Sequence, residues 1–90
     1  MDLEDLFLEN LNTQEKFNAL EKLRNRGYKL DFHTTSHPTH EELGSSKEEI
    51  SRELIKKYGT NNVSAVRVCM CVVKRDSYVQ YYYRIYIKKN

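Results

Sequence analysis

The 90-residue sequence contains no tryptophan, one proline, three glycines and two cysteines. So little glycine and proline excludes a collagen-like chain and a flexible linker, because both classes are rich in these residues. The sequence also lacks any apolar run near the roughly 18 residues that a transmembrane helix needs. Three of its first five residues, Asp2, Glu4 and Asp5, are acidic, whereas a secretory signal begins with basic residues. We therefore expect a cytoplasmic protein that does not enter a membrane.

The two cysteines, Cys69 and Cys71, are too few for a disulfide framework. Residues two apart in an extended segment have Cα atoms near the upper limit of about 7 Å for a disulfide. A bridge between them is therefore not expected. We predict that both thiols stay reduced, which agrees with a reducing compartment.

Hydrophobic residues make up 39% and charged residues 31% of the chain, a balance typical of a soluble domain. Because domains average roughly 100 to 150 residues, residues 1–90 are expected to form one domain with a single core. The net charge is only +2, but residues 61–90 contain six basic residues and one acidic residue. This basic segment attracts phosphate groups or an acidic protein surface, so its charge permits either kind of partner.

The spacing of apolar residues predicts a helix at residues 3–10. Leu3, Leu6 and Phe7 stand at positions i, i+3 and i+4 behind a capping Asp2, and much of the remaining surface is acidic. This is the pattern of an amphipathic helix with one buried face.

Two further helices have start and stop signals. One begins at Asn12 or Thr13, residue types that cap helices, and ends at Gly27, a residue type common just beyond a helix. The other covers residues 46–59, with a capping box at its start and Gly59 at its end. Their apolar stripes consist of Phe17, Leu20 and Leu23 in the first and of Ile50, Leu54, Ile55 and Tyr58 in the second.

Strands are predicted where apolar and polar residues alternate. Residues 28–33 have this pattern, and β-branched and aromatic residues fill residues 62–73 and 78–88 on either side of a turn at 74–77. Residues 35–46 are predicted to be a loop, because they contain the proline and few apolar residues. The predicted fold is α+β, with three helices packed on one face of a three-stranded sheet and a long C-terminal β-hairpin.

Side chains on the two hairpin strands should alternate between the faces of the sheet. One face is mainly apolar and is expected to form the core; it holds Val66, Val68, Met70, Val72, Val79, Tyr81, Tyr83, Ile85 and Ile87. The other face is expected to be exposed, and Lys29, Asp31 and His33 extend it onto the first strand. We predict a partner-binding surface on that exposed face, formed by Arg67, Tyr78, Tyr82, Arg84, Tyr86 and Lys88.

Tyrosine and arginine are enriched among the residues that dominate the binding energy of protein interfaces. The predicted surface therefore indicates a non-enzymatic protein that binds a macromolecular partner and needs no cofactor. Two alternatives stay open. The face is buried within the chain or in a homodimer, or it binds single-stranded nucleic acid, because bases stack on aromatic rings while Lys and Arg contact phosphates.

A metal site is a further alternative. His33, His37 and His40 together with Cys69 and Cys71 provide enough nitrogen and sulfur ligands for zinc if the loop folds over the hairpin. However, a Cys-x-Cys pair on a strand does not have the spacing of a zinc knuckle. We therefore expect no bound metal.

The segment from Leu20 to Tyr28 (LEKLRNRGY), followed by Ser36-His37, resembles the helix-to-strand opening of the HicA-type messenger-RNA interferase toxins. The resemblance covers under a quarter of the chain, and it implies an RNA-cleaving enzyme with His37 as the active histidine. The predicted helix at 46–59 stands where that family continues with strands, and Thr35 replaces the glycine of the family's Gly-Ser-His. RNA cleavage is therefore the less favoured function.

In overall style the chain resembles small accessory proteins of bacteriophages and other mobile elements, which are short, rich in Lys, Glu, Asn and Tyr, and poor in Gly and Pro. Those proteins include anti-CRISPR inhibitors, and they share no common motif. The resemblance implies stoichiometric binding to a host or defence-system protein, or to a protein–nucleic acid complex. We therefore expect an inhibitor or modulator without catalytic activity.

Overall fold

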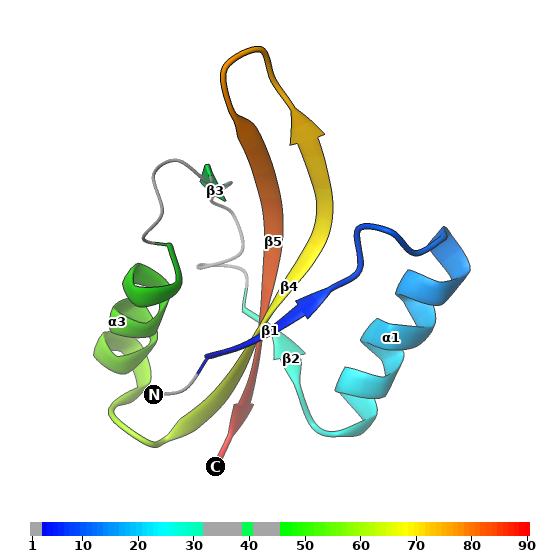
Figure 1. The fold of residues 1–90 in the computed structure, drawn as a ribbon. Helices are drawn as coiled ribbons and strands as arrows, with labels where there is room; N and C mark the ends of the chain where they lie inside the picture. Colours follow the sequence, from blue (N-terminus) through cyan, green and yellow to red (C-terminus); the bar gives the residue numbers. More distant parts are fainter. Residues whose placement is uncertain (1–2, 32–38, 41–45) are drawn as a thin grey trace.

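A computed structural model of the chain describes residues 3–31, 39–40 and 46–90 (Figure 1). The elements follow one another in the order β1 (Leu3–Phe7), α1 (Thr13–Asn25), β2 (Lys29–Leu30), β3 (Thr39–His40), α3 (Ser46–Tyr58), β4 (Val63–Lys74) and β5 (Val79–Lys89). Helices and strands are thus combined around one sheet, and the predicted α+β class is confirmed.

β4 and β5 form the predicted long antiparallel hairpin, closed by a turn in which the Arg75 amide donates a hydrogen bond to the Tyr78 carbonyl at 2.8 Å. β1 lies parallel to β4, and β2 lies antiparallel to β5, which gives the strand order β1-β4-β5-β2. The short β3 also pairs with β5. The sheet therefore exceeds the three strands predicted, because residues 3–7 and 39–40 join it.

The helix predicted at residues 3–10 is wrong, because Leu3–Phe7 form strand β1. The apolar side chains of this segment do not share one face. Leu3 packs with α3, whereas Leu6 packs with α1 on the opposite side of the sheet. A strand that is covered on both sides does not show strict alternation, so over these few residues the apolar spacing resembles that of a helix.

Helix α1 begins and ends where its capping residues predict. The Asn12 side chain accepts a hydrogen bond from the Glu15 amide at 2.8 Å, and the Glu15 side chain accepts one from the Asn12 amide at 3.2 Å. This capping box satisfies two backbone amides. At the other end Gly27 adopts a φ of +93°, and the Tyr28 amide donates to the Leu23 carbonyl at 3.1 Å. These features form a Schellman motif, which turns the chain from α1 into β2.

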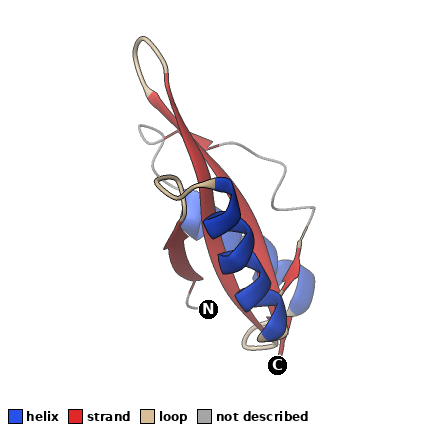
Figure 2. Ribbon diagram, turned by 90° about the vertical axis from the view of Figure 1, so that its right-hand side faces the viewer, coloured by secondary structure: helices blue, strands red, loops and turns tan. Residues whose placement is uncertain are grey.

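The two described helices lie on opposite faces of the sheet, so the prediction of three helices on one face is wrong (Figures 1 and 2). In Figure 2, α1 stands in front of the sheet and α3 stands behind it. α1 connects β1 to β2, two strands that run in the same direction. Such a connection must cross one face of the sheet, which leaves the other face for α3.

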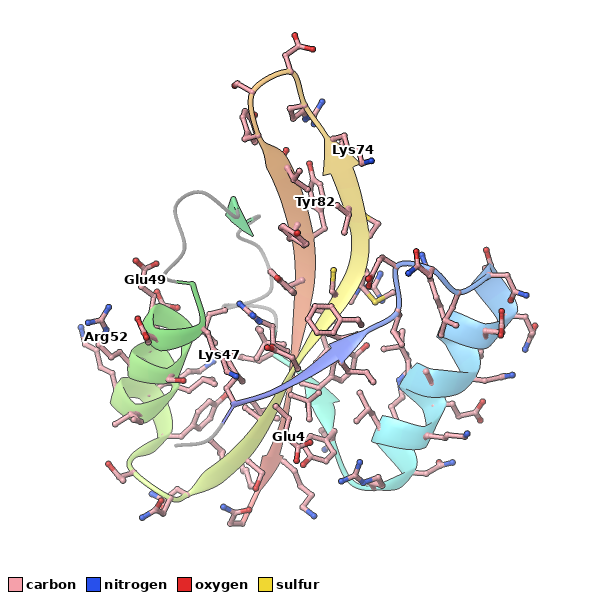
Figure 3. The ribbon with its side chains drawn as sticks, in the orientation of Figure 1. Glu4, Lys47, Glu49, Arg52, Lys74 and Tyr82 are labelled. Carbon is pink, nitrogen blue, oxygen red and sulfur yellow. The ribbon has the colours of Figure 1, made fainter. Side chains whose placement is uncertain are left out.

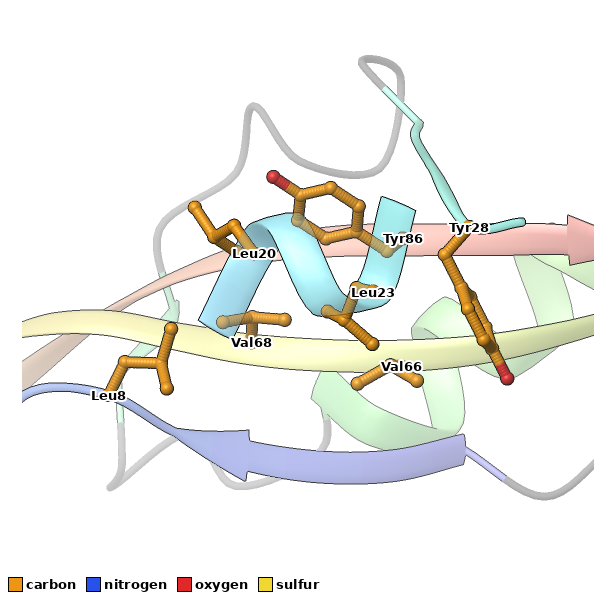
Figure 4. Packing of buried hydrophobic residues seen from close by; sticks show 7 residues of the cluster. All are labelled: Leu8, Leu20, Leu23, Tyr28, Val66, Val68 and Tyr86. Atoms are coloured by element: carbon orange, nitrogen blue, oxygen red, sulfur yellow. The ribbon is translucent and has the colours of Figure 1, made fainter. Parts of the chain in front are cut away.

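Each helix covers its own hydrophobic cluster. The α1 cluster, shown in Figure 4, consists of Leu8, Leu20, Leu23, Tyr28, Val66, Val68 and Tyr86. The α3 cluster consists of Leu3, Ile50, Leu54, Ala65, Ile85 and Ile87. Of the apolar stripe predicted for α1, Leu20 and Leu23 are buried, whereas Phe17 is 56% exposed. The core is therefore divided by the sheet into two parts.

The side-chain alternation predicted for the hairpin is wrong. Val66 lies directly opposite Tyr86, and both side chains face α1, whereas the sequence predicts them on different faces. A β-bulge adds to the difference: Cys69 pairs with Tyr83 but Cys71 pairs with Tyr82, so β4 contains one extra residue relative to β5. Beyond the bulge the alternation of β4 is reversed.

The hairpin extends beyond both helices (Figure 1). We call residues 63–69 and 85–89 the base of the hairpin, and residues 70–84 its projecting half. At the base, most side chains are buried beneath α1 or α3. In the projecting half, every side chain except that of Gln80 is half-buried or exposed. Surface available to a partner is therefore concentrated in the projecting half.

Candidate functional site

The six residues predicted to form one binding surface lie on both faces of the sheet. The side chains on the α1 side are those of Tyr82, Arg84, Tyr86 and Lys88. Arg67 lies on the α3 side, and Tyr78 belongs to the turn. The prediction that Tyr86 is exposed is wrong: only 1% of it is accessible, because α1 covers its face of the sheet. The prediction is also wrong for Arg67, which is 9% exposed and pairs with Asp5. Tyr82, labelled in Figure 3, and Tyr78 are half-buried, and Arg84 and Lys88 are exposed.

The structure instead brings together Phe7, Tyr81 and Tyr83 on the α3 side, and we call these three residues the aromatic platform. Phe7 on β1 and Tyr83 on β5 both lie beside Cys69 of β4. The Tyr81 ring stacks beside that of Tyr83, with centroids 6.0 Å apart and planes 10° from parallel. The hydrophobic cluster under α3 reaches only to Ile85 on this strand. Phe7 is 55% exposed, so the platform offers accessible apolar surface beyond the helix.

Arg67 holds the platform in place from within the sheet. Its guanidinium carbon lies 4.2 Å from the centroid of the Tyr83 ring, a cation–π contact. Its Nε and Nη2 atoms donate to the two carboxylate oxygens of Asp5 at 2.8 and 3.2 Å, so the pair is bidentate. Because Arg67 is 9% exposed and fixed on two sides, the Tyr83 ring rests on a rigid support. Such preorganisation lowers the entropy that a binding partner must overcome.

Two cations beside the platform share one carboxylate. Asp5 accepts from Arg67, and Lys47 at the start of α3 lies 3.6 Å from the same carboxylate. The guanidinium charge is therefore matched within the cluster, and Lys47 is itself half-exposed and paired. The platform thus presents rings and hydroxyl groups, with the buried Arg67 charge matched by Asp5 and the exposed Lys47 only partly compensated by the same carboxylate.

Burial keeps the ionisable groups beneath the platform neutral. Burial raises the pKa of Tyr83, partly opposed by the Arg67 charge. The pKa of Cys69 is raised to about 11, first by burial and then by the negative charge of Glu9. Both groups therefore stay protonated near neutral pH. Thiol and phenol are weak nucleophiles in this form, so the chemistry of the platform suits noncovalent contact.

Two of the five residues predicted as alternative metal ligands, including the histidine predicted to be catalytic, lie outside the described residues. His33 and His37 lie within residues 32–38, which are not described, whereas His40 is part of β3. Within residues 3–31, 39–40 and 46–90, no group of three or more His, Cys, Asp or Glu side chains is placed to hold a metal ion. Cys69 is buried and Cys71 is exposed, and both are free thiols.

Sequence reasoning missed the aromatic platform, because it placed Phe7 in a helix and assigned Tyr81 and Tyr83 to the core. One signal in the sequence does point to it. Tyr81, Tyr82 and Tyr83 are consecutive, and three consecutive strand residues must place large rings on both faces whatever the alternation. At least one ring must then stand on each side of the hairpin.

The platform and its Arg67–Asp5 support form a rigid surface on a two-sided α+β sheet. Comparisons with protein-family models, with curated proteins and with solved structures found no match to this chain. Neither described helix has the length and apolar character needed to cross a membrane. The geometry of the platform is therefore the basis for the function proposed next.

Proposed function

We propose that this protein is a non-enzymatic binding protein that inhibits or modulates a macromolecular partner through the aromatic platform. The observation that supports this most strongly is the fixed Tyr83 ring, held by a buried guanidinium that is itself held by Asp5. Tyrosine rings supply large contact area at little conformational cost, and a rigid ring binds better than a mobile one. A host or defence-system protein, alone or within a protein–nucleic acid complex, is the partner that this chemistry favours.

The balance of charge favours a protein surface at the platform over a phosphate backbone. Single-stranded nucleic acid requires cations that follow the phosphates beside the stacked bases. Here Arg67, which supports the platform, is buried and paired with Asp5, and Lys47 pairs with the same carboxylate. A partner bound by this surface should therefore contribute apolar side chains, and its affinity should change little with salt.

The opposite side of the projecting half adds further contact area. Tyr82 and Arg84 lie there, half-buried and exposed respectively, and Tyr78 stands at the turn. Rings on both sides of a projecting hairpin are suited to insertion into a groove of a partner. Of the surface predicted from the sequence, these three residues and the exposed Lys88 remain accessible.

The test compares two phenylalanines of nearly equal exposure. Immobilised protein is incubated with a lysate of the cells that encode it, and bound protein is quantified. Combining Phe7→Ala with Tyr81→Ala should weaken capture by more than about 2 kcal/mol, because both changes remove central aromatic contacts. Phe17→Ala, on the outer side of α1, removes a ring that is 56% exposed, against 55% for Phe7, and should leave capture unchanged.

Three outcomes distinguish the alternatives. Capture that survives the Phe7 and Tyr81 changes removes the platform from the interface. Equal loss with Phe17→Ala would indicate a nonspecific effect of exposed rings. The third outcome is measured by sedimentation equilibrium, which gives the oligomeric state. If the unmodified protein is a dimer that dissociates when Phe7 and Tyr81 are replaced, the platform is a surface for self-association.

A further inference from the structure

The end of the molecule at the C-terminus of α1 carries more positive charge than the surroundings of the aromatic platform. Four exposed cations gather there, from α1, its C-cap, β2 and β5; they are Arg24, Arg26, Lys29 and Lys88. Among the residues that the structure describes, none of these four forms an ion pair with a carboxylate. Within the part of the chain that the structure describes, these four positive charges are therefore not paired with a carboxylate.

Two of these cations are positioned by a buried tyrosine. The Arg26 guanidinium carbon lies 5.4 Å, and the Lys88 ammonium nitrogen 5.7 Å, from the centroid of the Tyr28 ring. The Schellman turn brings them together, because Gly27 at φ +93° lets the chain reverse at this point. A side chain at Gly27 would also meet the Lys88 stem, since an added Cβ would lie 3.2 Å from Lys88 Cδ. The glycine thus leaves room for Lys88 to cross the turn.

A surface pocket of about 330 Å³ lies at the same place, lined among the described residues by Arg24, Gly27, Tyr28, Lys29 and Leu30. Its volume is at the lower end of the range of small-molecule sites, roughly 300 to 1,000 Å³. Tyr28 and Leu30 form the apolar part of the pocket wall, and the cations Arg24 and Lys29 form part of its lining. A ligand that fits this arrangement has a compact apolar part and at least one negative charge.

Stabilisation of the helix explains only part of this charge. Cations in the last turn of a helix interact favourably with its negative end, which accounts for Arg24. Lys29 and Lys88 lie on strands β2 and β5, where the helix does not require them. Interaction with the helix dipole therefore does not explain why Lys29 lines the pocket or why the Lys88 stem lies beside Gly27.

We propose that this pocket binds a nucleotide unit of a single-stranded nucleic acid. The base occupies the pocket against Tyr28 and Leu30, and the adjoining phosphates contact Lys29, Lys88 and Arg26. A nucleotide combines a compact apolar ring with phosphate, which is the combination that the pocket and its cations match. A membrane surface supplies anionic charge as well, but it offers no such unit to enter a pocket. The site shares no residue with the aromatic platform, so the same molecule can contact a protein and its bound nucleic acid.

The experiment measures fluorescence anisotropy of a labelled uridine octanucleotide. The unmodified protein should bind it, and log K should fall linearly with log salt, by about 0.7 per phosphate contacted. Combining Lys29→Glu with Lys88→Glu should weaken binding at least about tenfold and reduce the slope by about 1.4, the value for two lost phosphate contacts.

The matched control combines Arg52→Glu with Lys56→Glu on the exposed side of α3, which changes the net charge by the same amount. This variant should keep the affinity within about twofold of the unmodified protein, since both residues belong to α3, across the sheet from α1, and neither lines the pocket. Circular dichroism establishes that both variants are folded. Equal losses in the two variants would mean that only net charge matters, and the proposal would be abandoned.

Two competition arms identify the ligand. Unlabelled octanucleotide should displace the probe far better than uridine monophosphate, because only the strand offers several phosphates to the cations. Displacement by the mononucleotide at similar concentration overturns the assignment to a strand. Absence of octanucleotide binding, or binding only to phosphatidylserine vesicles, overturns the nucleotide assignment altogether. Either result leaves the platform proposal unaffected, since the Phe7 and Tyr81 variants test that separately.

Discussion

The two halves of the β4–β5 hairpin are made from the same pair of strands but have different surroundings. The base lies between two helices, and residues such as Val68 and Ile85 are fully buried there. Among the described residues, α1 reaches only the first residue of the projecting half, where Lys16 donates to the Met70 carbonyl at 2.8 Å, and every side chain of this half except that of Gln80 is at least partly accessible. The comparison indicates that the base supplies the stability of the fold and the projecting half supplies contact surface.

The largest expected effect on stability comes from making the same substitution, valine to alanine, once in each half of the hairpin. Val68→Ala should lower the free energy of unfolding by about 2 to 3 kcal/mol, because it opens a cavity beneath α1 at a residue that is fully buried. Val72→Ala, in the half-exposed part of the same strand, should cost less than about 1 kcal/mol. Urea denaturation monitored by circular dichroism measures both values. Equal costs would show that the projecting half is as tightly packed as the base.

An intermediate effect is expected at the boundary, where Arg67 of the base supports Tyr83 of the projecting half. Asp5→Ala leaves a guanidinium that is largely buried without its carboxylate, so unfolding should become easier by about 1 to 2 kcal/mol. Arg67→Met should behave similarly, and the double variant should cost clearly less than the sum of the two. Thermal and urea unfolding of the unmodified protein and of the three variants give the free energies of a double-mutant cycle. Additive costs would mean that the ion pair contributes nothing to the fold.

The smallest expected effect is a difference in the rate of chemical labelling between two cysteines, Cys69 in the base and Cys71 in the projecting half. Cys71 is exposed and Cys69 is buried, and the raised pKa of Cys69, about 11, keeps its thiol protonated at neutral pH. Since the thiolate is the reactive form, iodoacetamide should modify Cys71 at least about tenfold faster at neutral pH. Labelling of a Cys71→Ser variant should accelerate as the pH approaches about 11, where Cys69 ionises. Mass spectrometry of peptides from timed samples measures the rates, and similar rates at neutral pH would contradict the buried position of Cys69.

Elements with local signals could be predicted from the sequence. The capping box at Asn12 and the turn at Gly27 define α1 within a few residues, and β-branched and aromatic residues identify both hairpin strands. These features depend on neighbouring residues, so a single sequence contains the necessary information.

Features that depend on tertiary contacts could not be predicted in the same way. Leu3 and Leu6 are apolar because each side of β1 meets a different helix, and this arrangement has no sequence period of its own. The bulge at Cys69 and Cys71 shifts the alternation of β4 without any glycine to mark it. As a result, Tyr86 was expected to be exposed and Tyr83 to be buried, and the aromatic platform could not be found.

The parallel pairing of β1 with β4 has a consequence for how the chain folds as it is synthesised. Asp5 and Arg67 are separated by 62 residues, so β1 has no neighbour in the sheet until most of the chain has left the ribosome. Until then its apolar side chains remain available to chaperones or to unwanted association. Slowed translation just before residue 63 should prolong that interval, and the yield of folded protein should depend on codon choice there.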